Sequence, residues 1–168
     1  MSSLELAGEL QECAIVHGLT VATAESCTGG NIAHQVTSLS GSSGYFLGGI
    51  VSYANDIKQR VLGVSEAVLR NPGAVSEPCA RAMAEGARAL IGADLAVSTT
   101  GIAGPNGGTQ RKPVGLVYIG LATASATIVE RHVFPGDRAA VIEAATVRAL
   151  ELLIDAVREE TRAGHDDR

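Results

Sequence analysis

Hydrophobic positions in the first half of the chain alternate between helical spacing and short continuous runs. Leu6, Leu10 and Ala14 recur at the spacing of one helix face, and Gly18 follows them as a stop. The runs TVATAE and FLGGIVSY are typical of buried strands. The pattern predicts a helix over 3–17, a strand over 20–25, a helix over 26–39 and a strand over 46–53.

The second half continues the alternation and then changes it. Asn55 is expected to cap a helix that carries Lys58, a short helix is expected to follow Ser65, and Ser76 is expected to cap the helix after that. The predicted elements are a helix from Asn55, a short helix broken at 71–73, a helix to Leu90, strands over 94–99, 114–123 and 126–134, and a helix over 137–158. The last two strands follow each other directly, so we expect them to pair antiparallel. Ile142, Ala145, Ala149, Leu152 and Ala156 form the inward stripe of the last helix.

Strands that alternate with helices, followed by a strand pair, predict an α/β fold. We expect a three-layer α/β/α sandwich with a mixed, mainly parallel sheet, formed by a single domain over 1–161 with a frayed tail over 162–168. Ligands of such sheets gather beyond the carboxyl ends of the parallel strands. Three segments follow strand ends, 26–30, 53–58 and 100–108, and we expect them to converge there.

Composition excludes several classes of protein. The 168 residues are 46% hydrophobic and 18% charged, which excludes a disordered chain. A net charge of −5 and an aromatic content of 3% argue against a binder of nucleic acid. No apolar run suits a membrane span and no signal peptide is evident, so we expect a cytoplasmic protein. Cys13, Cys27 and Cys79 are scattered and odd in number, which argues against a disulfide framework.

The segment Ser26–Gly30 (SCTGG) opens the second predicted helix directly after a strand. Its backbone N–H groups suit a phosphate or an oxyanion, and the Ser26 hydroxyl suits a nucleophile. An ordinary N-cap serine explains the same spacing and is favoured on spacing alone. Cys27 is a rival nucleophile, because a helix N-terminus lowers the pKa of a thiol, but a small packed side chain is the simpler interpretation.

The loop Thr100–Gly108 (TGIAGPNGG) is rich in glycine. Such backbones approach ligands closely, although no Walker or dinucleotide motif is present. The histidines show no metal-ligand spacing, so we expect no metal site.

Three segments in this order carry a resemblance to a known family. They are TAESCTGG at 23–30, GAVSE at 73–77, and TGIAGP at 100–105 with KPVG at 112–115. The chain resembles the CinA carboxy-terminal domain family over residues 4–155, in a stand-alone form. The resemblance implies an amidohydrolase that converts nicotinamide mononucleotide (NMN) to nicotinate mononucleotide and ammonia, without metal or cofactor. A small-molecule nucleotide is then the partner, with no nucleic acid and no membrane. The oligomeric state does not follow from these residues, although we expect a homo-oligomer.

The resemblance implies Ser26 as nucleophile, Lys58 as its base and Tyr53 as a retained catalytic residue. A lysine serves as a base when desolvation or a nearby cation lowers its pKa from about 10.4. Tyr53 would then relay a proton or orient Lys58 through its hydroxyl. Without the resemblance, a solvated helix residue is the simpler interpretation of Lys58.

The remaining site residues are expected to bind substrate. Hydroxyls and backbone N–H groups would hold the ribose and phosphate, and Arg138 would meet the phosphate at the start of the last helix. The expected set is Thr28, Gly29, Gly30, Gly41, Ser42, Ser43, Asn55, Thr100, Gly101, Gly104, Gly107, Gly108 and Arg138.

One position departs from the family pattern. The family carries a second arginine four residues beyond the Gly-Asp-Arg arginine, and this chain has Ile142 there. If that arginine binds phosphate or tunes the lysine, the deamidase is impaired; burial in the apolar stripe explains an isoleucine equally well. A nucleotide-binding module with little turnover and an amidase for another small amide are therefore alternatives.

Overall fold

A five-stranded sheet forms the middle layer of the protein. The computed structural model describes residues 1–166. The strands lie in the order β2 (Phe46–Val51), β1 (Val21–Glu25), β3 (Leu95–Gly101), β4 (Leu116–Ala122) and β5 (Thr127–Val133). Strand β1 pairs parallel with β2 and β3, whereas β4 is antiparallel to both of its neighbours. Four strands therefore run in one direction, and the predicted mixed, mainly parallel sheet is confirmed.

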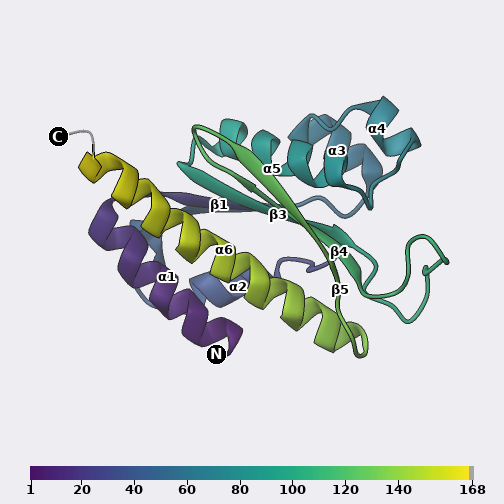
Figure 1. The fold of residues 1–168 in the computed structure, drawn as a ribbon, viewed down its shortest axis with the longest axis horizontal. Helices are drawn as coiled ribbons and strands as arrows, with labels where there is room; N and C mark the ends of the chain where they lie inside the picture. The colour runs from purple at the N-terminus through teal and green to yellow at the C-terminus, as the bar shows by residue number, and fades with distance from the viewer. Residues whose placement is uncertain (167–168) are drawn as a thin grey trace.

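Helices cover both faces of the sheet, which confirms the three-layer sandwich (Figure 1). One face carries α1 (Ser3–His17), α2 (Asn31–Thr37) and α6 (Arg138–Asp166), and the other carries α3 (Asn55–Leu62), α4 (Glu66–Arg70) and α5 (Glu77–Ile91). Each face has its own apolar cluster, because the three central strands are buried on both sides. The predicted cap at Ser76 is confirmed, because its hydroxyl accepts the N–H of Cys79, and Ser65 caps α4 in the same way.

Helix α2 begins at Asn31, five residues later than predicted. Residues 26–30 form a turn instead, in which Gly29 and Gly30 have φ angles of 60° and 98°. These left-handed angles are accessible to glycine and interrupt a right-handed helix. The prediction that Ser26 caps this helix is therefore wrong, since Gly30 occupies the N-cap. Asn55 is likewise not a cap, because Ala54 precedes α3 and Asn55 is its first residue.

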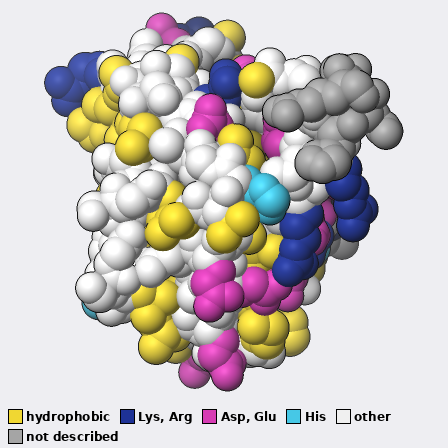
Figure 2. Space-filling model, turned by 90° about the vertical axis from the view of Figure 1, so that its left-hand side faces the viewer, with side chains coloured by type: hydrophobic (Ala, Val, Ile, Leu, Met, Phe, Trp, Pro, Cys, Tyr) yellow, Lys and Arg dark blue, Asp and Glu magenta, His cyan; other side chains and the backbone are white. Residues whose placement is uncertain are grey.

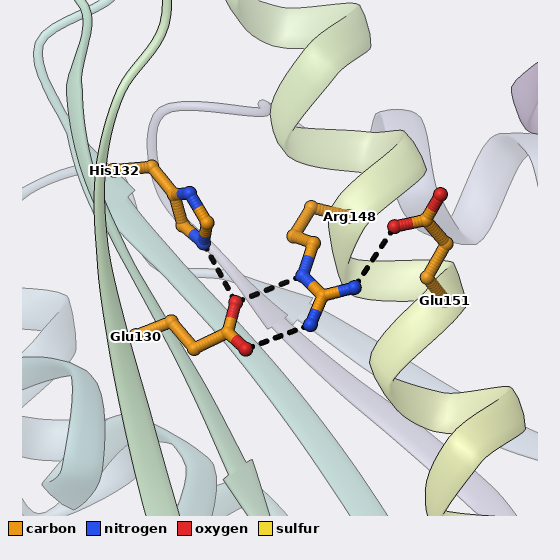
Figure 3. A network of polar contacts seen from close by, with 4 residues as sticks. All are labelled: Glu130, His132, Arg148 and Glu151. Atoms are coloured by element: carbon orange, nitrogen blue, oxygen red, sulfur yellow. Dashed lines mark hydrogen bonds and ion pairs between the residues drawn. The ribbon is translucent and has the colours of Figure 1, made fainter.

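Helix α6 is longer than predicted. It continues to Asp166, beyond the predicted end at residue 158, whereas 167–168 lie outside the described residues. The run REETR at 158–162 consists mostly of strong helix formers, which explains why the helix continues beyond residue 158. Near its middle, Arg148 joins α6 to the edge strand β5 through Glu130 (Figure 3).

The surface carries charges of both signs. On the side of the molecule that holds the C-terminal end of α6, acidic and basic side chains are interspersed with hydrophobic ones (Figure 2). The described residues of this side form no continuous basic surface of the kind that binds a phosphate backbone. None of the helices within residues 1–166 has the length and apolar character needed to span a membrane.

Candidate active site

A cavity of about 310 Å³ lies at the carboxyl ends of strands β1 and β3. The three segments expected to converge all contribute to its wall, together with the start of helix α6. The predicted site residues that line it are Ser26, Tyr53, Asn55, Lys58, Thr100, Gly101, Gly104, Gly107 and Arg138. Lys58 and Arg138 are the two basic residues of this lining, which contains no aspartate or glutamate. The cavity is therefore suited to an anionic ligand.

Ser26 is the first residue after strand β1. Its backbone N–H donates to Thr99 O at 3.0 Å, and its carbonyl oxygen accepts from Gly29 N at 3.0 Å. The residue is 8% exposed and contributes to the cavity wall. The backbone on both sides of Ser26 is thus held in place, while the side chain keeps access to the cavity.

Cys27 lies beside Ser26 in the cavity wall but is 7% exposed. Burial raises the pKa of its thiol to about 12, because a thiolate is poorly solvated there. At neutral pH the reactive thiolate is almost absent, so the environment favours the packed interpretation of Cys27.

Lys58 is buried, with an exposed fraction of 1%. Its amine donates to the carbonyl oxygen of Tyr53 at 3.0 Å, and burial lowers the pKa of this amine. Among the side chains that the structure describes, no carboxylate forms an ion pair with it. The solvated-lysine interpretation is therefore wrong, and the environment favours the neutral amine.

The close packing of helix α3 on helix α5 explains why Lys58 is buried. A Cβ atom at Gly86 of α5 would lie 2.0 Å from Leu62 O of α3. The absence of a side chain at Gly86 therefore lets the two backbones touch. Helix α3 is thereby held against the molecule with Lys58 directed inward, although most of its residues are polar.

Tyr53 contacts Lys58 through its backbone and not through its hydroxyl. Tyr53 is 62% exposed, and its hydroxyl accepts a hydrogen bond from Arg138 Nη2 at 3.2 Å. Arg138 also donates to Gly104 O at 2.9 Å. Arg138 therefore bridges two rims of the cavity, and the expected orientation of Lys58 by the Tyr53 hydroxyl is absent from this structure.

Most of the glycine-rich loop, but not all of it, lines the cavity. The Thr100 hydroxyl donates to Ala74 O at 2.8 Å, which ties the end of β3 to the loop before α5. Gly108 does not line the cavity, because it packs against Pro113 and Val114. Sequence reasoning did not assign Ala74 or Val75 to the site, although both line it. They belong to the GAVSE segment, in which only the family resemblance is a signal of function.

Thr28, Gly29 and Gly30 lie in the turn beneath the cavity wall and do not line it. The Thr28 hydroxyl is buried between Glu25 and Thr99. The expected free N–H groups at the start of helix α2 are also occupied, since Ile32 N and Ala33 N donate to the Glu25 carboxylate. This helix terminus is therefore not an open anion site.

Gly41, Ser42 and Ser43 lie at the other end of the sheet. They form a short 3-10 turn, η1 (Ser42–Gly44), directly before strand β2. Because β2 runs parallel to β1, residues that precede β2 lie at the amino edge, opposite the cavity. Gly41 is instead next to Gln11 of helix α1. The structure therefore does not bring this predicted group to the cavity.

Ile142 lies in a neighbouring hollow. It is half-buried, packs against the apolar cluster, and lines an apolar cavity of about 710 Å³ together with Ala103, Pro105, Val114 and Ala139. Arg138 and Ala103 belong to the linings of both cavities. Position 142 thus borders the candidate active site through these two shared residues but is not part of its lining. Residues 1–166 contain no cluster of three or more His, Cys, Asp or Glu side chains placed to hold a metal ion.

Comparison with known proteins relates the chain to one family. Residues 3–157 match the model described as the CinA C-terminal domain. A CinA-like protein from Geobacter sulfurreducens is 53% identical over 136 residues, which are 81% of this chain and 33% of that protein. A CinA-like protein from Salinibacter ruber is 57% identical over 119 residues, which are 71% of this chain and 29% of that protein. The chain spans about a third of the length of these curated relatives.

Solved structures of similar proteins share the fold of this chain over almost their full length. The competence/damage inducible protein CihA from Agrobacterium tumefaciens has a TM-score of 0.90 at 40% identity and covers 93% of this chain and 95% of its own. The competence damage-inducible protein A (ComA) from Klebsiella pneumoniae has a TM-score of 0.89 at 35% identity, covering 92% and 96%. Sequence and fold thus agree: the chain belongs to the CinA C-terminal domain family.

Proposed function

We propose that the protein is an amidohydrolase that converts NMN to nicotinate mononucleotide and ammonia. The observation that carries this proposal is a buried lysine without a counterion in the same cavity as a serine hydroxyl. An amide is a poor electrophile, so its hydrolysis requires an activated nucleophile and a site for the oxyanion. A neutral Lys58 supplies the base that Ser26 otherwise lacks.

The reaction proceeds in two halves. Ser26 Oγ attacks the carboxamide carbon and passes its proton to Lys58, and the protonated Lys58 then gives a proton to the departing ammonia. This leaves an ester between Ser26 and the nicotinoyl group. A water molecule attacks that ester with Lys58 again as base, and the proton returns to Ser26 as nicotinate mononucleotide leaves.

Backbone N–H groups beside Ser26 are suited to the oxyanion. Cys27 lines the cavity, and within the described residues its N–H group donates no backbone hydrogen bond. This group directly follows the nucleophile in the turn, as in other enzymes with a serine at a strand-to-turn junction. Donors of this kind stabilise the negative charge that develops on the carbonyl oxygen.

Charge and shape of the cavity support a nucleotide substrate. Arg138 lies at the rim, where its guanidinium bridges Tyr53 and Gly104, and it is exposed. A phosphate would replace these neutral acceptors with a charged one, which forms a stronger hydrogen bond. Asn55 and the loop glycines provide amide groups for the ribose.

A binding module with little turnover is the second candidate. The observation in its favour is Ile142, which places an apolar side chain one helical turn from Arg138, where the family pattern has a cation. Such a module would retain NMN affinity without hydrolysing it.

Ammonia release from NMN by the purified protein tests the proposal. Ser26→Ala should remove at least about 3 kcal/mol of transition-state stabilisation, a hundredfold or more in rate. Cys27→Ala should retain most of the activity, because its thiol is protonated. If Ser26→Ala loses little activity and Cys27→Ala is inactive, the assignment of Ser26 as the nucleophile is wrong. NMN binding without ammonia release would favour the binding module, and equal rates with nicotinamide riboside would favour an amidase that ignores phosphate.

A further inference from the structure

The carboxylate of Glu25 is buried under the turn that carries Ser26. Glu25 is 1% exposed and is the last residue of strand β1. Its Oε1 accepts from the Thr28 hydroxyl at 2.6 Å and from Ile32 N at 2.9 Å, and its Oε2 accepts from Ala33 N at 3.1 Å. The side chain thus reaches past the turn to the first residues of helix α2.

All three donors to this carboxylate are uncharged. Among the described residues, no lysine, arginine or histidine pairs with Glu25. A buried carboxylate is costly unless donors satisfy it, and the cost of losing one such donor is high. The position of the turn between β1 and α2 is therefore coupled to the complete set of bonds to Glu25.

Thr28 extends this set to strand β3. Its hydroxyl donates to Glu25, so the short contact with Thr99 Oγ1 at 2.8 Å has Thr99 as the donor. The backbone of Thr99 meanwhile accepts the N–H of Ser26. Two sets of hydrogen bonds therefore hold the turn against strand β3. One is made by the Ser26 backbone, and the other by the Glu25 and Thr28 side chains.

From this network we infer that Glu25 is a positioning residue, which sets the place of the Ser26 hydroxyl through Thr28 and the N-terminus of helix α2. The inference rests on the proposed function, because Ser26 must be the nucleophile for its place to matter in catalysis. Glu25 itself does not line the cavity and does not touch substrate. Its role is to hold the turn so that the hydroxyl faces the carboxamide and the base.

The glutamine variant tests this role most directly. Glu25→Gln keeps the shape of the side chain but presents an NH₂ group to a donor, which breaks at least one of the three bonds. A displacement of the nucleophile by about 1 Å costs roughly a hundredfold in rate, so kcat should fall by about that factor while KM for NMN stays within about twofold. Thr28→Val should act in the same direction, and Thr28→Ser, which restores the hydroxyl, should recover most of the loss.

Ser98→Ala is the matched control for lost stability. The Ser98 hydroxyl is buried and donates to Ala80 O at 2.6 Å, on the same sheet but outside the cavity lining. Its variant should lower the melting temperature with little change in kcat. If Ser98→Ala and Glu25→Gln lose kcat equally at equal stability loss, the inference is wrong.

Crystal structures of the wild-type and Glu25→Gln proteins separate this inference from the proposed function. A shifted turn at 26–30, with β1 and α2 in place, supports the positioning role even if the wild type does not hydrolyse NMN. A Ser26 side chain in the wild-type place overturns it, whatever the activity. Ammonia release by the wild type decides the proposed function separately.

Discussion

At the scale of single residues, burial changes the chemistry of two neighbours in opposite directions. It raises the pKa of the Cys27 thiol and lowers the pKa of the Lys58 amine, because in each case burial disfavours the charged form. For a thiol the charged form is the nucleophile, and for an amine the neutral form is the base. The same wall therefore suppresses Cys27 as a nucleophile and favours Lys58 as a base.

Replacing Lys58 with arginine should nearly abolish turnover. A guanidinium stays protonated and cannot accept the serine proton, so Lys58→Arg should lose at least about a hundredfold in kcat. In the wild type, kcat should rise with pH through one ionisation below the pKa of free lysine, since the lowered pKa leaves the amine neutral above that point. Steady-state rates over pH and lysine-selective NMR titration measure both.

Lys112→Arg is the control for this variant, because Lys112 is the only other lysine of the chain and lies outside the cavity lining. Its amine donates to Pro72 O, a bond that an arginine can also make. If Lys58→Arg retains a near-normal kcat, Lys58 is not the base of the reaction.

Introducing an arginine at position 142 should strengthen NMN binding. Ile142 lines the apolar cavity that shares Arg138 with the active site, so a guanidinium there would add a second cation near the phosphate. One charge-assisted contact contributes roughly 1.5–3 kcal/mol, which corresponds to a tenfold or greater decrease in KM. Ile142→Leu should leave KM unchanged. If Ile142→Arg lowers both melting temperature and turnover, Ile142 serves only in packing.

At the scale of elements, strand β5 is joined to helix α6 by a network of charged side chains (Figure 3). Arg148 of α6 donates two hydrogen bonds to Glu130 of β5, at 2.9 and 2.7 Å, and a third to Glu151. His132, which stacks on Phe134, lies 2.6 Å from the same Glu130 carboxylate. The network fastens an edge strand of the sheet to the long helix whose first residue is Arg138.

Loss of the Glu130 charge should destabilise the protein in a pH-dependent way. Hydrogen bonds from Arg148 lower the pKa of Glu130 to about 2. An unfolded glutamate has a pKa of about 4.3, so this stabilisation is present above that pH and is lost as the pH falls towards 2. Glu130→Gln should lower the free energy of unfolding by about 1–2 kcal/mol at pH 7 and should flatten its decrease between pH 5 and 3.

Urea unfolding at several pH values measures this effect. Glu66→Gln is the control, because its partner Arg70 and Glu66 itself are largely exposed, and such pairs contribute less than about 1 kcal/mol. Parallel pH profiles for wild type and Glu130→Gln would contradict the assignment of acid sensitivity to this network.

At the scale of the whole molecule, the site lies where the chain reverses its direction of travel across the sheet. The connection from β1 to β2 passes through α2 on one face, and the connection from β2 back to β3 passes through α3, α4 and α5 on the other. The crevice outside the carboxyl ends of β1 and β3 is left open between these connections. Three segments that are far apart in the sequence therefore border one cavity.

The sequence by itself determined the layered architecture and most of the cavity wall. Apolar periodicity predicted α1 and α5 closely, and the alternation of strands and helices predicted the convergence of 26–30, 53–58 and 100–108. These features depend on the local pattern of apolar residues and on the common direction of parallel strands, and both can be inferred from one sequence. The same pattern does not predict the position of a residue that is held by partners distant in the sequence.

Only the tertiary structure decided which of the predicted residues lie together. The polar helix around Lys58 appears solvated in sequence, yet its contact with Gly86 of α5 buries the amine and lowers its pKa. Gly41, Ser42 and Ser43 were expected to bind the ribose or phosphate, but they precede a strand and thus lie at the opposite edge of the sheet. The first N–H groups of α2 donate to Glu25 across the turn and are therefore closed to a ligand. Burial, and the pKa values that follow from it, are created by elements remote in the chain, so no local pattern contains them.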